Sequence, residues 1–160
     1  MAISYDFAIA TRSTTAQVAR ALHDLAQAIG LLSAPVAAES LMTDGAVTAG
    51  GTWLRVVETS PAPWNSVVTY LGFNPTLSVA FRLESDSDIT SQQDDMIRLV
   101  DGLLGQFTGD AVLHFEYEII WLLRRDGDLS LNDEDDVWPP HRLALMSQPY
   151  HRATYHFAAE

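Results

Sequence analysis

His114, Glu116 and Glu118 stand at every second position of a stretch in which apolar and polar side chains alternate. In a strand, side chains two residues apart lie on one face, so an imidazole and two carboxylates would project together. Such a set could bind Zn²⁺ or a harder divalent cation, or perform acid–base catalysis. The same pattern is typical of a solvated or partner-facing sheet surface. We favour the surface interpretation and expect neither a metal nor a cofactor.

A second, denser group of carboxylates follows along the chain. An EF-hand calcium loop has glycine at its sixth position and glutamate at its twelfth. Counted from Asp126, these positions hold Leu131 and Val137, so the EF-hand interpretation fails. Two compatible interpretations remain: a polar turn before a helix with Asn132 as N-cap, or a projecting acidic surface for a cationic partner. The carboxylates of this group are Asp126, Asp128, Asp133, Glu134, Asp135 and Asp136.

The motifs that place a nucleophile beside a base are absent from the sequence. It contains no Gly-x-Ser-x-Gly, no His-Glu-x-x-His and no glycine-rich phosphate loop. Trp64 and Trp138 stand beside prolines, where an aromatic side chain either anchors a partner or covers an edge of the core. The sequence therefore favours a binding protein over an enzyme.

The composition of the chain limits the classes of partner that it is expected to bind. The 160 residues carry a formal net charge of −12, and all nine basic residues are arginine. This charge repels nucleic acid and attracts a basic protein. The absence of cysteine removes disulfides and thiol chemistry, and the apolar fraction of 48% is too high for a disordered chain. We expect a single globular domain over residues 1–160.

Two further features bear on location. The N-terminus has no basic segment before an apolar one, as a signal peptide would have. The longest run of aliphatic and aromatic residues, 119–123, is far shorter than the roughly 20 residues that span a membrane. We expect a cytoplasmic protein without a membrane span.

Hydrophobic periodicity predicts two helices and several strands. Helical spacing follows a capping box of Thr14 and Gln17, and a second apolar stripe follows a possible capping box of Thr90 and Gln93. Asp126-Gly127 predicts a two-residue hairpin turn. The expected strands span residues 3–9, 46–49, 53–59, 77–84, 111–123, 129–131 and 152–157. Two helices cannot cover both faces of so wide a sheet, so we expect an α+β fold with both helices on one face of a mostly antiparallel sheet.

Several stretches together resemble the Sit-type immunity family, small bacterial proteins that protect kin against swarming-inhibition toxins. The resemblance covers nearly the whole chain and includes Ser4-Tyr5-Asp6 before a capped helix. Its other stretches are residues 91–96, 109–118, 121–125 and 138–140. It implies a non-enzymatic protein that sequesters or blocks a cognate toxin.

The interface is chosen on physical grounds, because the resemblance supplies no residue set. An acidic inhibitor suits a basic toxin such as a nuclease. The first choice is the carboxylate group 126–136 with Trp138 as aromatic anchor, and the second is Glu116 with Glu118. A metal-dependent or small-molecule enzyme that uses His114, Glu116 and Glu118 is the alternative. A third hypothesis, a subunit that pairs with another copy beyond Ile120, stays open, as does the oligomeric state.

Overall fold

The computed structural model describes residues 2–157. Within this range the strands are β1 Ala2–Ile9, β2 Ala46–Val47, β3 Trp53–Glu58, β4 Leu77–Glu84, β5 Ala111–Phe115, β6 Ile119–Arg125, β7 Asp128–Leu131 and β8 His151–Arg152. They form one eight-stranded sheet in the order β2-β3-β4-β1-β5-β6-β7-β8 over the described residues. Neighbouring strands are antiparallel except β7 and β8, which are parallel. The expected α+β fold with a mostly antiparallel sheet is confirmed.

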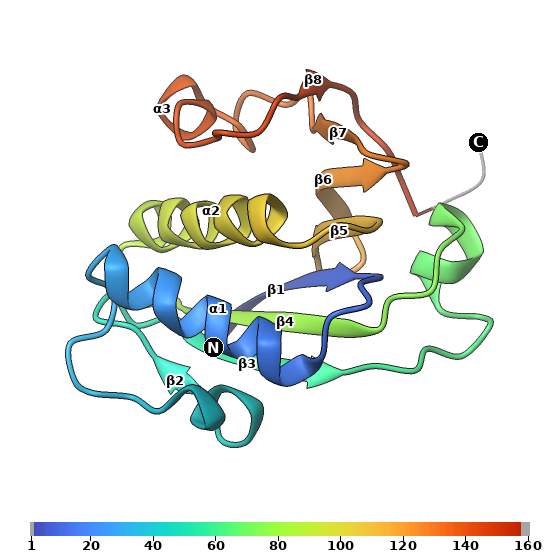
Figure 1. Ribbon diagram of the computed structural model, residues 1–160. Coiled ribbons are helices and arrows are strands. Elements are labelled where there is room, and N and C mark those ends of the chain that lie inside the picture. Colours follow the sequence, from blue (N-terminus) through green and yellow to red (C-terminus); the bar gives the residue numbers. More distant parts are fainter. Residues whose placement is uncertain (1, 158–160) are drawn as a thin grey trace.

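Both long helices pack on one face of the sheet (Figure 1). α1 (Thr15–Ala28) begins with the expected capping box, in which the Gln17 amide donates to the Thr14 hydroxyl at 3.1 Å. α2 (Ile89–Gln106) begins two residues earlier than the predicted capping box of Thr90 and Gln93 implies. Asp88, held in an extended conformation, accepts the Ser91 N–H at 3.1 Å, so Asp88 rather than Thr90 is the cap. Three short helical turns complete the described elements: η1 Ala38–Met42, η2 Val67–Leu71 and α3 Pro140–Leu143.

The core lies between the helices and the face of the sheet that carries Phe7, Val79 and Phe81. The opposite face carries a smaller apolar cluster, in which η2 covers Val112 and Leu123. Beyond this cluster, Asp6 and Ala80 on the same face are only partly buried.

The predicted single strand over residues 111–123 is wrong, because the chain turns between Phe115 and Ile119. Glu116 and Tyr117 adopt left-handed backbone angles, with φ of 49° and 60°. The Glu118 N–H donates to the Phe115 carbonyl at 2.8 Å and closes the turn. The turn makes β5 and β6 antiparallel neighbours in the interior of the sheet. Most of the apolar side chains of both strands are buried there.

The predicted closing strand over residues 152–157 is also shorter in the structure. β8 ends at Arg152, and the Thr154 hydroxyl accepts the Asp133 N–H at 3.0 Å instead of continuing the ladder. The chain then returns toward the β5–β6 turn, where the Phe157 ring packs against His114 and Tyr117.

Candidate functional site

The structure does not bring His114, Glu116 and Glu118 onto a shared face. His114 is 1% exposed on β5, whereas both glutamates are exposed in the β5–β6 turn. Among residues 2–157, no group of three or more His, Asp or Glu side chains is arranged to hold a metal ion. The shared projection that motivated a metal or catalytic site is therefore absent from the described fold.

His114 is instead a neutral core residue. Its Nδ1 accepts the Tyr117 N–H at 3.1 Å, and its ring lies 4.3 Å from the Tyr117 ring centroid. Burial lowers the pKa of His114 to about 4, because the charged imidazolium would lose its hydration. The ring is therefore uncharged at neutral pH, and its proton lies on Nε2.

The predicted acidic residues divide between the two ends of the β6–β7 hairpin. β6 has seven residues and so separates these ends by about 20 Å. Asp126 and Asp128 lie at the hairpin turn. The remaining six lie at the opposite end, which we call the acidic end: Glu116, Glu118, Asp133, Glu134, Asp135 and Asp136.

At the acidic end, carboxylates from two separate segments line one hollow. The hollow has a volume of about 250 Å³ and is bordered by Glu118, Glu134 and Asp136. Ile119 and Tyr155, both partly exposed, supply apolar lining. Within the described residues, none of the three carboxylates forms an ion pair or a side-chain hydrogen bond. On the sequence, Glu134 and Asp136 belong to the first choice of interface and Glu118 belongs to the second. In the structure all three line the same hollow.

Buried polar contacts hold the acidic segment 133–136 beside this turn. The Asn132 side chain donates to the Ile120 carbonyl at 2.8 Å and accepts the Glu134 N–H at 2.8 Å. Asn132 thus caps a turn, as one sequence interpretation expected, although no helix begins there. The Trp138 indole donates to the Trp121 carbonyl at 2.7 Å.

The two tryptophans beside prolines have opposite environments. Trp138 is 0% exposed, so its indole belongs to the core and supports the acidic segment from beneath. Trp64 is 83% exposed in the loop before η2. The side chain of its neighbour Asn65 lies 3.4 Å from the Tyr117 hydroxyl, which joins this loop to the β5–β6 turn. Trp64 is therefore the tryptophan that is accessible to a partner.

Arg142, which the sequence analysis did not single out, fastens α3 to α2. Its guanidinium is buried, donates to Asp94 at 2.8 Å and to the Val137 carbonyl at 2.7 Å, and lies over the Trp121 ring. No local pattern distinguishes this arginine from the exposed ones, because its charged partner Asp94 is 48 residues away on α2.

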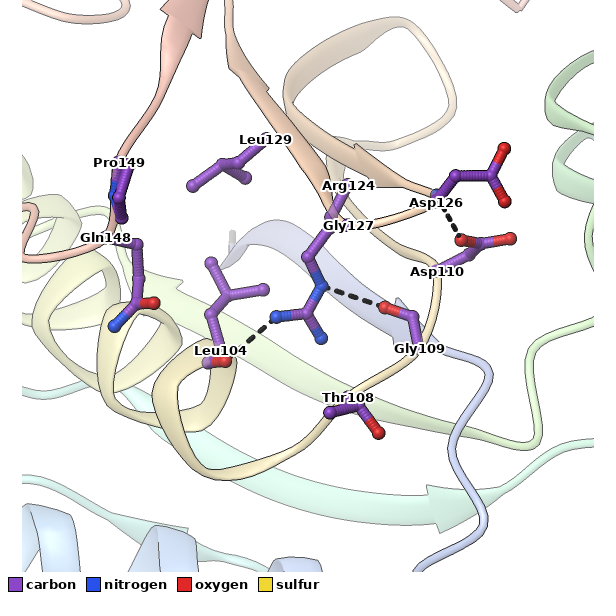
Figure 2. A pocket seen from close by; sticks show the side chains of 10 residues that line it. All are labelled: Leu104, Thr108, Gly109, Asp110, Arg124, Asp126, Gly127, Leu129, Gln148 and Pro149. Atoms are coloured by element: carbon purple, nitrogen blue, oxygen red, sulfur yellow. Dashed lines mark hydrogen bonds between the residues drawn. The ribbon is translucent and has the colours of Figure 1, made fainter.

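The opposite end of the hairpin holds a larger hollow of about 370 Å³ (Figure 2). Here the Asp126 N–H donates to Asp110 at 2.9 Å. Arg124 donates through its three nitrogens to the carbonyls of Leu104, Phe107 and Gly109, at 2.8, 2.7 and 2.8 Å. Burial lowers the pKa of Arg124, and Asp110 acts against that shift. The guanidinium caps the C-terminus of α2, because it donates to backbone carbonyls at the end of that helix. Its role at this hollow is therefore structural.

No helix of the described residues is long and apolar enough to cross a membrane. A family model described as SitI3-like matches residues 3–142, which is most of the chain. The comparisons with curated proteins and with solved structures gave no match.

Proposed function

The chain belongs to the SitI3-like family, and we propose that it is a non-enzymatic immunity protein that binds and neutralises a cognate basic toxin through its acidic end. The observation that carries this proposal is the convergence of Glu118, Glu134 and Asp136 on one hollow. Carboxylates that lack partners in the free protein are suited to receive cations from another molecule.

The hollow suits a lysine or arginine side chain of the toxin. The aliphatic part of such a side chain would pack on Ile119 and Tyr155, while its charged group reaches the carboxylates. Arginine would add stacking on the tyrosine ring. Trp64, Tyr117 and Tyr155 supply exposed aromatic area of the kind that dominates protein interfaces.

Asp126 and Asp128 have a different part in the proposal. They lie about 20 Å from the acidic end, beyond the screening length of about 8 Å at physiological salt. They therefore contribute mainly to the long-range attraction of the toxin, which is strongest at low salt. We place the encounter in the cytoplasm, where a protective protein would meet a toxin that has entered the cell.

The experiment uses the protein as bait in lysate from its native cells, with washes of low and then moderate salt. Each retained protein is then expressed in a sensitive host with and without the bait protein. Restored growth on co-expression supports neutralisation. Undiminished toxicity of every retained protein in the presence of the bait contradicts it.

A matched pair of variants tests whether the acidic end is the surface that binds the toxin. The acidic-end variant carries Glu116→Gln, Glu118→Gln, Asp133→Asn, Glu134→Gln, Asp135→Asn and Asp136→Asn. The control neutralises six exposed carboxylates elsewhere: Glu39, Asp44, Glu58, Asp86, Asp126 and Asp128. Both variants have the same net charge, so a difference in protection reports the site rather than the overall field. Equal protection by the two variants would remove the acidic end from the proposal.

A further inference from the structure

A cavity of about 270 Å³ opens on the sheet face opposite α1 and α2. Its floor comes from β1 and β4, where the small side chains of Ala8 and Ala80 leave space above the sheet. Val57, Pro61 and Val67 supply apolar walls. This volume suits a ligand smaller than the drug-sized molecules that occupy pockets of about 300–1,000 Å³.

Three polar side chains of complementary kind line this cavity, and apart from the bond at the His114 Nδ1 none of them forms a hydrogen bond or ion pair with a described residue. His114 is 1% exposed, and its Nδ1 already accepts the Tyr117 N–H. Its Nε2–H therefore remains as a donor, and no described residue accepts it. Asp6, half-buried, lies directly across the β1–β5 ladder from His114. The Asp6 carboxylate has no hydrogen bond or ion pair to a described side chain.

Arg82 is the third group. Asp6 pairs in register with Ala80, so Arg82 is its diagonal neighbour on β4. Diagonal neighbours stand about 7–8 Å apart. Within residues 2–157 the Arg82 guanidinium forms no ion pair, and it lies 5.3 Å from the centre of the Trp53 ring. A cation and an anion thus both line one cavity, from diagonal positions on neighbouring strands.

We propose that this cavity binds a free α-amino acid with a small apolar side chain. Its ammonium group pairs with Asp6, while its carboxylate receives Arg82 and the His114 Nε2–H. An anion alone would be repelled by Asp6, and a cation alone would be repelled by Arg82. A zwitterion satisfies all three groups, and its side chain contacts Val57 and Pro61.

The proposal does not rest on toxin binding, since Asp6, Arg82 and His114 lie outside the acidic end, although Tyr117 borders the cavity and is also part of the proposed toxin surface. It is tested by nuclear magnetic resonance titration of the intact protein with L-valine, L-valinamide and N-acetyl-L-valine. The amide lacks the carboxylate charge and the acetyl compound lacks the ammonium charge. We expect saturable shifts at the cavity with L-valine, and binding about tenfold weaker or worse for the other two.

Single substitutions test the proposed contacts of Asp6 and Arg82 with the bound amino acid. Asp6→Asn and Arg82→Gln should each weaken L-valine binding about tenfold, whereas Arg20→Gln on the exposed surface of α1 leaves it unchanged. A thermal melt of each variant verifies folding, and the three-compound comparison on the unaltered protein decides the question if a variant does not fold. Absence of saturable shifts up to the solubility of L-valine, or equal binding of all three compounds, would overturn the proposal.

Discussion

The indole N–H of Trp138 donates to the backbone carbonyl of Trp121 at 2.7 Å. Trp121 belongs to β6, and Trp138 follows the acidic segment 133–136, so this bond ties that segment to the strand next to the β5–β6 turn. Both tryptophans are buried. The bond therefore fixes the position of one set of carboxylates relative to the other and maintains the hollow at the acidic end.

Trp138→Phe should remove this donor and part of the packed ring. We expect the free energy of unfolding to fall by about 1–3 kcal/mol, because the Trp121 carbonyl loses one of its two donors and a small cavity forms. Urea denaturation measures the change. Trp64→Phe is the matched control and should shift stability by less than about 0.5 kcal/mol, since Trp64 is exposed. Equal losses in the two variants would contradict the supporting role of Trp138.

His114 should make the protein less stable in acid. Its pKa is about 4 in the folded state and about 6.5 when unfolded, so the unfolded chain binds more protons between these values. Stability therefore falls as the pH drops through this window, by about 2 kcal/mol between pH 7 and pH 5.

His114→Gln removes this component, and the difference between the two proteins at each pH isolates it. Asp6, which faces His114, has a pKa raised by burial and acts in the opposite sense, but it is present in both proteins. Denaturant unfolding at pH 7 and pH 5 gives the four free energies. Parallel losses of stability in both proteins would show that His114 does not titrate as described.

Arg124→Lys should not replace the arginine at the end of α2. A lysine cannot donate in three fixed directions to the carbonyls of Leu104, Phe107 and Gly109. We expect a loss of about 2–4 kcal/mol and faster hydrogen exchange in the last turn of α2. Arg125→Lys on the neighbouring exposed position is the control. A fully stable Arg124→Lys protein would contradict the capping role.

Local sequence patterns predicted those elements whose boundaries depend on local contacts. The Thr14–Gln17 capping box and the Asp126-Gly127 turn are each closed by residues within a few positions, and both occur as predicted. The β5–β6 turn escaped prediction because Glu116 and Tyr117 take left-handed angles without glycine, asparagine or aspartate to signal them. Apolar and polar residues alternate on both sides of the turn, so the sequence pattern gave no sign that one strand ends and another begins there.

The site was predictable only in part, for a similar reason. The exposure of the carboxylates follows from their charge, but their division between two ends follows from the register of β6 and β7. Trp64 and Trp138 both stand beside prolines, and tertiary packing alone buries one and exposes the other. The partners of Arg142 on α2 are equally remote in sequence.

Association kinetics with the toxin that the bait retains test toxin binding at the acidic end most directly. The unaltered protein, the acidic-end variant and the charge-matched control are compared by stopped-flow mixing at low and physiological salt. We predict that the acidic-end variant associates at least tenfold more slowly and loses most of its salt dependence, while the control changes much less at physiological salt. Equal association rates for the two variants would contradict binding through the acidic end.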